Sequence, residues 1–577
     1  MQISSIPLAQ SVVMLCLSKD IHHVVISPGS RNAPLTISFS NHPQIEAYSV
    51  VDERSAAFFA LGLAQQLKKP VALVCTSGSA LLNYYPAVAE AFYSDIPLVV
   101  ISADRPIERI DIGDGQTIRQ RNVFQNHILC SANLHSELAL DSFPKDRKVQ
   151  QKFSEAQKLN EREINLALNT AIEQSGPVHI NVPFYEPLYN VVEEILVAPL
   201  EIEPIREPKT ISAEALKKYS ALWNKAKRKL VLVGVHEPNQ IEQALLDELA
   251  KDPSVLIFTE TTSNLHHENF ITRIDKLIAP LEVSENPEEA FKELQPEILL
   301  TFGGLVISKK IKSFLRTYSP QQHWHVDAKT ALNTYFCLNK HFDVAPNEFL
   351  KHFLPQVDSP KSEYRDFWLG VKERRDVHHN QYINRIPFCD LKVFSQIVKH
   401  FPKQQLIHFS NSSIIRYAQL FKFYEAQYVY CNRGTSGIDG SSSTAVGAAV
   451  ASKLPTTLVT GDLSFLYDSN ALWNNYIPTN FKIILINNQG GGIFKILPGA
   501  KETENFSTFF ETKHELTAEH LCKMFGFAYQ TAHNEEELEA GLTSLYAEDK
   551  KPQLLEVFTP SDINDKYLKD YFKFILP

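Results

Sequence analysis

Two polar residues, Asp462 and Asn488, stand where two apolar runs of the sequence end. The runs are residues 457–460 and 482–486, and a helix-like segment at 466–475 separates them. In open α/β sheets, ligands bind outside the carboxyl ends of the strands, so we expect the two side chains to converge there. A carboxylate, an amide and nearby backbone carbonyls suit a hard divalent cation that also holds phosphates.

Either turn alone is more often a plain strand-end turn that uses Asp, Asn and Gly. The two turns joined by a segment of βαβ length are much more specific. Gly461-Asp462 followed by Asn487-Asn488 resembles the segment with which thiamine-diphosphate enzymes bind the diphosphate and its metal ion. Three glycines follow Gln489 and let the backbone approach a ligand closely.

Glu53 is the second candidate for chemistry. It follows an apolar run at 45–51 and opens a helix pattern in the order D-E-R-S-A-A. A first-turn carboxylate favoured by the helix dipole is the plain structural explanation. Thiamine-diphosphate enzymes, however, need a carboxylate at N1′ of the aminopyrimidine, while the cofactor supplies the carbanion chemistry. Together with the metal-like segment, Glu53 is therefore the predicted activating carboxylate.

A set of arginines gives the third signal. Five of them lie at or just after predicted strand ends: Arg31, Arg105, Arg119, Arg416 and Arg433. Three neutral side chains in the same loops add hydrogen-bonding groups: Ser30, Gln116 and Ser412. Each arginine alone is more often a surface or ion-pair residue, but arginine binds carboxylates bidentately and stays charged. Their shared placement predicts a substrate with several carboxylates.

The elements that must position these residues are strands alternating with helices. The expected strands are 24–27, 45–51, 71–76, 98–103, 178–182, 230–235, 255–260, 298–302, 323–327, 406–409, 428–430, 457–460, 482–486 and 554–558. Expected helices include 54–67, 80–93 and the small-residue segment 444–453, which would allow close packing. Nearly continuous apolar strands separated by helices indicate parallel sheets covered on both faces.

Length and composition narrow the class of protein. A chain of 577 residues is too long for one core, so several domains are expected. The net charge of −9 and the scattered basic residues give no footprint for nucleic acid. Seven dispersed cysteines without a CxxC pair indicate a reducing cytosol. The apolar stretch 12–17 is too short to span a membrane. We therefore expect a cytoplasmic protein.

Over essentially its whole length the chain resembles the family of menaquinone-pathway 2-succinyl-5-enolpyruvyl-6-hydroxy-3-cyclohexene-1-carboxylate synthases. The resemblance is carried by SPGSR (27–31), DERSAAFFALGLA (52–64), TSGSALLNYYPAVAEA (76–91), ADRP (103–106), GQTIRQ (115–120), NSSIIR (411–416), NRGTSGIDG (432–440), GDLSFLYDSNAL (461–472) and NNQGGGIFKILPG (487–499). ISPGSR and NRGxSGIDG separate this family from other thiamine-diphosphate enzymes.

The resemblance implies an α/β fold of three doubly wound parallel-sheet domains. These are a pyrimidine-binding domain at 1–185, a central domain at 205–355 and a diphosphate-binding domain at 375–577. It also implies thiamine diphosphate with Mg²⁺ or Mn²⁺ as cofactors. The active site would lie between two subunits, so the expected assembly is a homodimer or homotetramer.

The resemblance also assigns roles to single residues. Asp462, Asn488 and the Gly490 carbonyl would hold the metal ion, Glu53 would activate the cofactor, and Ile438 would wedge it into a bent shape. Ten positions match those that the family uses around its substrates: Ser30, Arg31, Arg105, Gln116, Ser412, Arg416, Arg433, Ile493, Phe494 and Leu497. Arg31 and Gln116 would also take part in catalysis.

The implied reaction decarboxylates 2-oxoglutarate and adds the resulting enamine to isochorismate in a 1,4 fashion. The alternative is another thiamine-diphosphate 2-oxoacid decarboxylase or acetohydroxyacid-type synthase, which predicts fewer strand-end arginines. A non-catalytic cofactor-binding protein is disfavoured because Glu53, Asp462 and Asn488 are all present. One departure stands in the central domain, where Lys310 replaces an arginine of a basic family segment.

Overall fold

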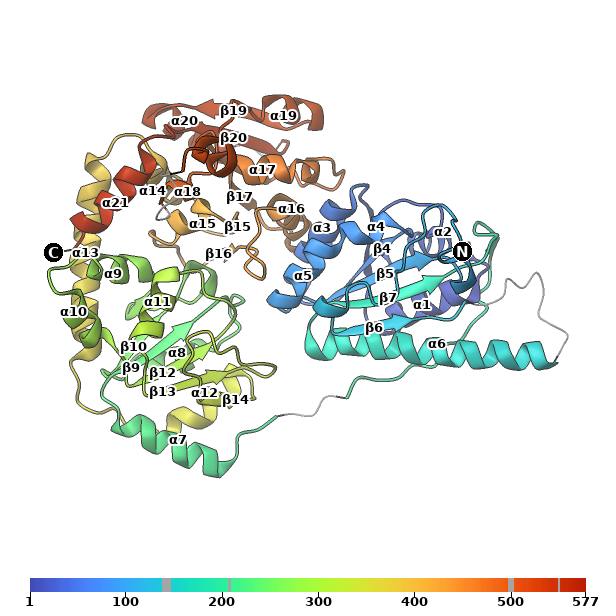
Figure 1. Cartoon of the computed structure of the whole chain (residues 1–577), viewed down its shortest axis with the longest axis horizontal. Coiled ribbons are helices and arrows are strands. Elements are labelled where there is room, and N and C mark those ends of the chain that lie inside the picture. The colour runs from blue at the N-terminus through green and yellow to red at the C-terminus, as the bar shows by residue number, and fades with distance from the viewer. Residues whose placement is uncertain (137–146, 206–208, 497–502, 548–549, 577) are drawn as a thin grey trace. The chain divides into compact units, whose positions relative to one another are not determined.

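Three six-stranded sheets, each flanked by helices, form the framework of the protein (Figure 1). The computed structural model describes residues 1–136, 147–205, 209–496, 503–547 and 550–576. The chain divides into two compact units. The first contains Met1–Arg206, Gly434–Lys453 and Tyr467–Phe481, and the second contains Glu207–Arg433, Leu454–Leu466 and Lys482–Pro577.

The sheet of the first unit has the strand order β3-β2-β4-β5-β7-β6. Its strands are β2 (His23–Ile26), β3 (Glu46–Ser49), β4 (Val71–Cys75), β5 (Leu98–Asp104), β6 (Cys130–Asn133) and β7 (Val178–Pro183). All five pairings are parallel. The strand order reverses at β2 and β4, and such a reversal is where open α/β sheets bind ligands.

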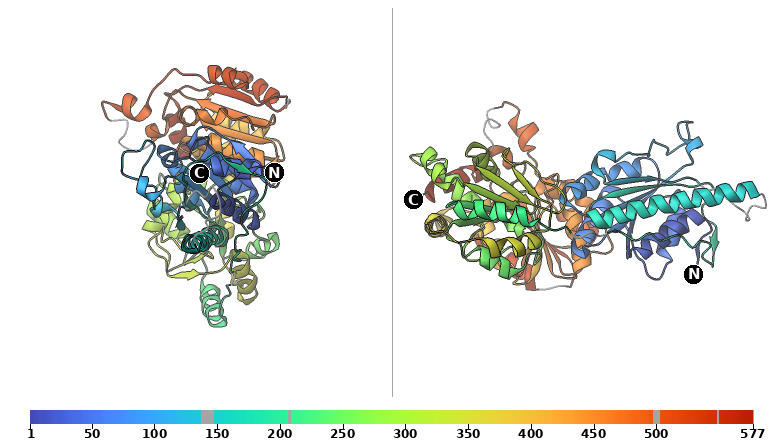
Figure 2. Two further views of the ribbon diagram at one scale, coloured as in Figure 1. Left: turned by 90° about the vertical axis from the view of Figure 1, so that its right-hand side faces the viewer. Right: turned by 90° about the horizontal axis from the view of Figure 1, so that it is seen from below.

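Helices cover this sheet and bury its apolar strands. They include α1 (Pro7–Ser18), α3 (Glu53–Leu67) and α6 (Arg147–Gln174), the last of which runs along the sheet in Figure 2. The single helix predicted at 80–93 is two helices, α4 (Ser79–Asn83) and α5 (Tyr85–Ser94). Pro86 has no N–H with which to continue the hydrogen-bond ladder across that point.

Helix α16 (Ser441–Ser452) packs tightly against α3 in the same unit. A Cβ atom on Gly62 would lie 2.1 Å from the Thr444 carbonyl oxygen, and one on Gly447 would lie 2.0 Å from the Phe59 carbonyl oxygen. Neither position has room for a side chain. The prediction that this small-residue helix allows close packing is confirmed.

The second unit contains two parallel sheets. One has the order β11-β10-β9-β12-β13-β14, with β9 (Lys229–Val233), β10 (Val255–Phe258), β11 (Phe270–Ile271), β12 (Ile298–Phe302), β13 (Gln322–Val326) and β14 (Lys340–Phe342). The other has the order β16-β15-β17-β18-β20-β19, with β15 (Gln405–Phe409), β16 (Gln427–Tyr430), β17 (Thr456–Gly461), β18 (Phe481–Asn487), β19 (Ala528–Ala532) and β20 (Gln553–Phe558). In the latter sheet the order reverses at β15 and β17, which again marks a ligand-binding edge.

Helices connect and cover these two sheets. Those that matter below are α9 (Ile274–Leu281), α11 (Lys309–Thr317), α13 (Tyr364–Arg385), α14 (Asp390–His400), α15 (Ser413–Ala418), α17 (Asp462–Tyr467), α18 (Ile493–Ile496) and α21 (Asn564–Phe574). No helix in the described ranges is both long enough and apolar enough to cross a membrane. The predicted α/β class with parallel sheets is confirmed, while the three domain boundaries stay a prediction.

The helix predicted at 466–475 is wrong. Helix α17 ends at Tyr467, and a short 3-10 turn, Ser469–Leu472, follows it. Asp468 between them is fully buried and accepts hydrogen bonds from the Ser443 N–H (2.7 Å) and hydroxyl (2.9 Å). This contact with α16 fixes a bend where the local sequence suggests a continuous helix.

Candidate active site

Asp462 and Gly490 are brought together at the carboxyl ends of β17 and β18. Asp462 is the first residue of α17 and is 4% exposed. Its Oδ1 accepts a hydrogen bond from the Leu463 N–H (2.7 Å), and its Oδ2 accepts one from the Gly490 N–H (2.9 Å). Gly490 has a φ of 148°, and a Cβ there would lie 2.4 Å from the Glu511 carbonyl oxygen. Only glycine fits this position.

Asn488 is held by a residue that the sequence did not single out. Its Nδ2 donates to Oδ2 of Asp390, the first residue of α14, at 3.0 Å. The other Asp390 oxygen accepts from the Thr559 hydroxyl at 2.6 Å, and the Asp390 N–H donates to the Asn564 side chain at 2.8 Å. Burial raises the pKa of the Asp390 carboxyl to about 6, against the opposing effect of these hydrogen bonds. The anchored amide nitrogen leaves the Asn488 carbonyl oxygen as its free ligand atom.

This donor set fits a hard divalent cation. It offers one carboxylate, one oriented amide oxygen and backbone carbonyls of the glycine loop, all of which are oxygen ligands of the kind that Mg²⁺ prefers. Among the described residues, no three His, Cys, Asp or Glu side chains form a metal-binding group. Such a group is not needed where amide and carbonyl oxygens share the coordination with the phosphates of a bound ligand.

His514 also approaches Asp462. Its Nε2 lies 3.4 Å from Asp462 Oδ2, and this carboxylate raises the pKa of the imidazole. The segment around His514 lies over the glycine loop, because the Gly491 N–H donates to the Glu511 carbonyl (2.5 Å) and the His514 N–H to the Gln489 carbonyl (3.3 Å). The His514 imidazole therefore lies beside the Asp462 carboxylate in the way that a bound cation would.

Glu53 opens α3 in the first unit. The preceding residue, Asp52, caps the helix by accepting from the Ser55 N–H at 2.9 Å, and its other oxygen accepts from Asn470 at 2.7 Å. Glu53 itself is half-buried, and its carboxylate makes no hydrogen bond or ion pair with the described residues. The capped helix start therefore fixes the backbone of Glu53, and its carboxylate is available for a ligand.

Ile438 lies in the loop before α16, in the same unit as Glu53, and is 38% exposed. The start of this loop is fixed by Glu90, which is buried on α5. The Glu90 carboxylate accepts from the N–H groups of Gly434 (2.7 Å) and Thr435 (2.6 Å) and from the Thr435 hydroxyl (2.8 Å). An exposed isoleucine on an anchored loop can present an apolar surface to a cofactor.

Arg105 and Gln116 meet at the carboxyl edge of the first sheet. Arg105 Nη1 donates to the Ser77 hydroxyl (2.8 Å) and to the Gln116 carbonyl (2.7 Å). Gln116 has a left-handed φ of 55°, and its side chain is exposed. Partial burial and the charge of Arg31 both lower the pKa of Arg105, so the two guanidinium groups lie near one another.

Arg31 is braced at this edge by the chain that follows β7. It donates to the Phe184 carbonyl (3.2 Å) and to the Glu186 carboxylate (3.0 Å), while the Ser30 hydroxyl accepts from Tyr189 (3.1 Å). Arg119 differs from the other arginines: its side chain is 82% exposed and pairs with Asp111 at 2.9 Å. The structure therefore groups Arg31, Arg105, Ser30 and Gln116 and leaves Arg119 outside.

A second pair of arginines lies at the carboxyl edge of the last sheet. Arg416 on α15 donates to the carbonyl of Ser412, the residue that precedes this helix, at 2.9 Å. Arg433 after β16 donates to the Asn411 side chain at 2.5 Å. Burial and the charge of Arg433 lower the pKa of Arg416, so these two cations are also neighbours. Two close positive charges favour a carboxylate between them.

Comparisons with known proteins match the chain to thiamine-diphosphate enzymes. The family description "Thiamine pyrophosphate enzyme, N-terminal TPP binding domain" matches residues 7–133, "Middle domain of thiamine pyrophosphate" matches 206–409, and "Thiamine pyrophosphate enzyme, C-terminal TPP binding domain" matches 412–557. A 2-succinyl-5-enolpyruvyl-6-hydroxy-3-cyclohexene-1-carboxylate synthase of Christiangramia forsetii is 63% identical over 575 residues, which cover 100% of both chains.

Proteins of the same name in Flavobacterium psychrophilum and Porphyromonas gingivalis are 55% and 38% identical, over 98% and 96% of this chain and 98% and 95% of theirs. The chain belongs to this synthase family. It is a thiamine-diphosphate-dependent enzyme that forms carbon–carbon bonds. The resemblance drawn from the motifs is confirmed, and these relatives do not carry the name of the alternative, an acetohydroxyacid-type synthase.

Three more residues that the sequence analysis named lie in the second unit: Ile493, Phe494 and Lys310. Ile493 and Phe494 open α18, where Ile493 is 9% exposed and Phe494 contacts the Phe510 ring at 5.8 Å. Leu497 lies outside the described residues. Lys310, which replaces a family arginine, forms an ion pair with Glu282 on the surface.

Asp390, Glu90 and His514 are the site residues that sequence reasoning missed. Asp390 follows no apolar strand, and its importance depends on α14 lying against the end of β18. Glu90 reads as one polar residue of an ordinary helix. No local pattern marks any of them, since each acts through a partner far away in the chain.

Proposed function

We propose that the protein is a 2-succinyl-5-enolpyruvyl-6-hydroxy-3-cyclohexene-1-carboxylate synthase that acts on 2-oxoglutarate and isochorismate. 2-Oxoglutarate would lose CO₂, and its remaining four-carbon unit would be joined to the isochorismate ring. The observation that carries the proposal is the strand-end cluster of Asp462, Gly490 and Asn488, in a chain with full-length relatives of this name.

Asp462, Asn488 and the Gly490 carbonyl would hold Mg²⁺ or Mn²⁺ and, through it, the cofactor's diphosphate. Asp390 would keep the Asn488 amide oxygen turned toward the ion. Thiamine diphosphate, when bound, supplies the carbanion chemistry that amino-acid side chains cannot provide. The side chains of the protein would orient the cofactor and transfer protons to and from it.

Glu53 would exchange a proton with N1′ of the aminopyrimidine ring. The start of α3 fixes its backbone, and the carboxylate is available because it has no hydrogen-bond or ion-pair partner among the described residues. Ile438 would press against the cofactor from its anchored loop and keep the two rings bent toward each other. Both residues would act because they are held in place beside the cofactor. The start of α3 holds Glu53, and the loop anchored by Glu90 holds Ile438.

The two arginine pairs would bind the substrates' carboxylates. Arg31 and Arg105 form one pair, and Arg416 and Arg433 form the other. Gln116 and the hydroxyls of Ser30 and Ser412 would hydrogen-bond neutral substrate oxygens: this set matches substrates with several acidic groups. Ile493, Phe494 and Leu497 would form an apolar wall that excludes water during the reaction.

We also propose a homodimer or homotetramer in the cytoplasm. The assembly follows from the family's arrangement, in which the pyrimidine-binding domain of one subunit and the diphosphate-binding domain of another share a cofactor. The location follows from seven dispersed cysteines, none of them in a CxxC pair.

The direct test incubates the protein with thiamine diphosphate, Mg²⁺ and 2-oxoglutarate, with and without isochorismate. We expect CO₂ release from 2-oxoglutarate and formation of the adduct only when isochorismate is present. Pyruvate serves as the competing substrate. Faster turnover of pyruvate than of 2-oxoglutarate would favour the alternative synthase and reject the proposal.

A further inference from the structure

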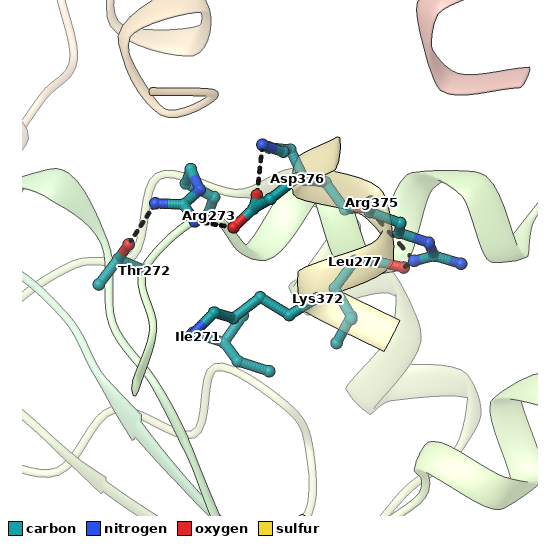
Figure 3. A pocket seen from close by; sticks show the side chains of 8 residues that line it. Ile271, Thr272, Arg273, Leu277, Lys372, Arg375 and Asp376 are labelled. Atoms are coloured by element: carbon teal, nitrogen blue, oxygen red, sulfur yellow. Dashed lines mark hydrogen bonds and ion pairs between the residues drawn. The ribbon is translucent and has the colours of Figure 1, made fainter. Parts of the chain in front are cut away.

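A narrow crevice lined with positive charge lies between the sheet that contains β9–β14 and the long helix α13, within the second unit. Figure 3 shows the side chains that line it. They come from the end of β11, from α9 and from α13: Ile271, Thr272, Arg273, Lys276, Leu277, Lys372, Arg375 and Asp376. None of these residues belongs to the proposed active site.

The charges of the crevice do not balance. Four cationic side chains and a single carboxylate, Asp376, line the crevice, which leaves an excess of three positive charges among the lining residues. Asp376 Oδ2 accepts from Arg273 at 2.5 Å, and Oδ1 accepts from Lys276 at 2.7 Å, so one carboxylate serves two cations. In Figure 3, Lys372 extends beneath this group, and no dashed line joins it to Asp376.

The other two cations have partners without charge. Lys372 donates to the Glu268 carbonyl (2.9 Å) and the Phe270 carbonyl (3.5 Å). Arg375 donates to the carbonyls of Lys276 (3.3 Å) and Leu277. Its buried Nε–H has no partner among the described residues.

The position of Arg375 has a partly structural explanation. Pro280 lies inside α9 and has no N–H, so the Lys276 carbonyl lacks its normal helical donor. Arg375 supplies that missing hydrogen bond. A neutral donor could do the same, however, and a hydrogen bond to a carbonyl does not cancel a full charge.

The excess positive charge of the crevice is energetically unfavourable because two of its cationic side chains are buried. Lys276 is 5% exposed and Arg375 is 3% exposed. Burial, together with neighbouring cations, lowers the pKa of Lys276 to about 8 and that of Arg375 to about 10, and it lowers the pKa of Lys372 as well. Buried like charges are stable only when an opposite charge compensates them.

We propose that this crevice binds a small inorganic anion, with Arg273, Lys276 and Lys372 as its cationic ligands. The free space at its centre is about that of one water molecule, which suits a halide ion or one oxygen of an oxyanion at the mouth. The bound anion would join β11 and α9 to α13 through charge-assisted contacts.

The test uses the full-length protein with saturating thiamine diphosphate and Mg²⁺, so that the diphosphate site is filled. Sodium chloride or sodium phosphate is titrated at constant ionic strength, which sodium gluconate maintains. The thermal unfolding midpoint and the heat of binding are recorded. Saturable stabilisation by chloride identifies a halide site, and stabilisation by phosphate alone identifies an oxyanion site. Stabilisation by neither anion overturns the proposal.

Variants locate the effect. Lys372→Gln should weaken anion binding at least about tenfold, and Asp376→Asn should strengthen it, because they change the excess charge in opposite directions. Lys251→Gln, on an exposed lysine of the same unit, is the control and should leave the affinity unchanged. Arg273→Gln replaces Lys372→Gln if that variant does not fold. Equal anion affinities in the wild type and in the crevice variants would show that the anion binds elsewhere.

Discussion

At the scale of single residues, the Asp390–Asn488 contact makes the sharpest prediction about the cofactor site. Asp390→Asn replaces an acceptor by an amide that can also present N–H groups to Asn488, so the Asn488 oxygen loses its fixed direction. Substitution of such supporting residues typically weakens metal affinity about 10–100-fold. We expect a loss of that size in Mn²⁺ binding, measured by electron paramagnetic resonance in the presence of thiamine diphosphate.

The control for this variant is Asp570→Asn, which changes an exposed carboxylate on α21 and should leave Mn²⁺ affinity unchanged. If Asp390→Asn only destabilised the fold, it would lower the thermal unfolding midpoint but leave the Mn²⁺ affinity at low temperature unchanged. If Asp390→Asn binds Mn²⁺ as tightly as the wild type does, Asp390 does not position the metal ligand.

Glu53 offers a second prediction at this scale. Glu53→Gln keeps the size of the side chain but removes its ability to exchange a proton with the cofactor. Turnover should fall at least about 100-fold, the lower end of what a positioned acid–base group contributes. Thiamine diphosphate should still bind, as followed by its circular dichroism signal. Near-normal turnover in this variant would remove Glu53 from its proposed role.

The sequence identified the residues that follow strand ends and missed those that support them. All three predicted cofactor-site residues stand where an apolar run stops. Asp462 and Asn488 follow neighbouring strands of one sheet and share its carboxyl edge, whereas Glu53 follows β3 of the first sheet. Asp390 gives no such signal, because its partner lies about a hundred positions away and on a different element. Long-range side-chain contacts of this kind are specified by packing and not by local pattern.

At the scale of elements, every central strand of the three sheets was predictable, whereas of the edge strands only β3 and β16 were. Strands such as β5 and β18 are fully buried and read as continuous apolar runs. The edge strands β6, β14 and β19 carry mixed sequences such as CSAN, KHF and AYQTA. An edge strand covers less of the core and can do without an apolar run, so periodicity does not reveal strands such as β6, β14 and β19.

The α3–α16 contact predicts the sign of a glycine substitution. Gly447→Ala adds a Cβ only 2.0 Å from the Phe59 carbonyl oxygen, so the two helices must separate. We expect a loss of about 1–3 kcal/mol in stability, the usual cost of overpacking. Gly370→Ala on α13 is the matched control, because its Cβ would meet nothing closer than an Arg374 side-chain atom at 3.6 Å.

For Gly370→Ala, the higher helix propensity of alanine should raise stability by up to about 1 kcal/mol. Urea unfolding of both variants measures the two effects. If both variants change the free energy of unfolding equally and in the same direction, helix propensity alone explains the change. The close contact between α3 and α16 then contributes nothing to stability.

The packing of α13 against α21 predicts a dependence on pH. His379 is buried there, its Nδ1 lies 2.8 Å from the Tyr571 hydroxyl, and burial lowers its pKa to about 3. The folded imidazole stays neutral while the unfolded one takes up a proton below about pH 6.5. The stability that it contributes is therefore complete above pH 6.5 and is lost as the pH falls, by about 2 kcal/mol at pH 5.

His379→Gln has no such proton uptake. The difference in the free energy of unfolding between wild type and variant should therefore shift by about 2 kcal/mol in favour of the variant from pH 7.5 to pH 5. His352→Gln, on an exposed histidine, should show no comparable shift. A constant difference between wild type and His379→Gln across this range would mean that His379 protonates without cost in the folded protein.

At the scale of the whole molecule, the proposed shared site can be tested by complementation. Glu53→Gln and Asp462→Asn should each be inactive as pure homodimers. If Glu53 of one subunit and Asp462 of another form each site, a mixed dimer has one site with both changes and one with neither.

When equal amounts of the two variants exchange subunits freely in a two-fold symmetric dimer, about a quarter of the wild-type activity should be restored. Sites formed within single chains would give no recovery on mixing, whatever the assembly, so the absence of recovery in exchanged samples would reject the shared site.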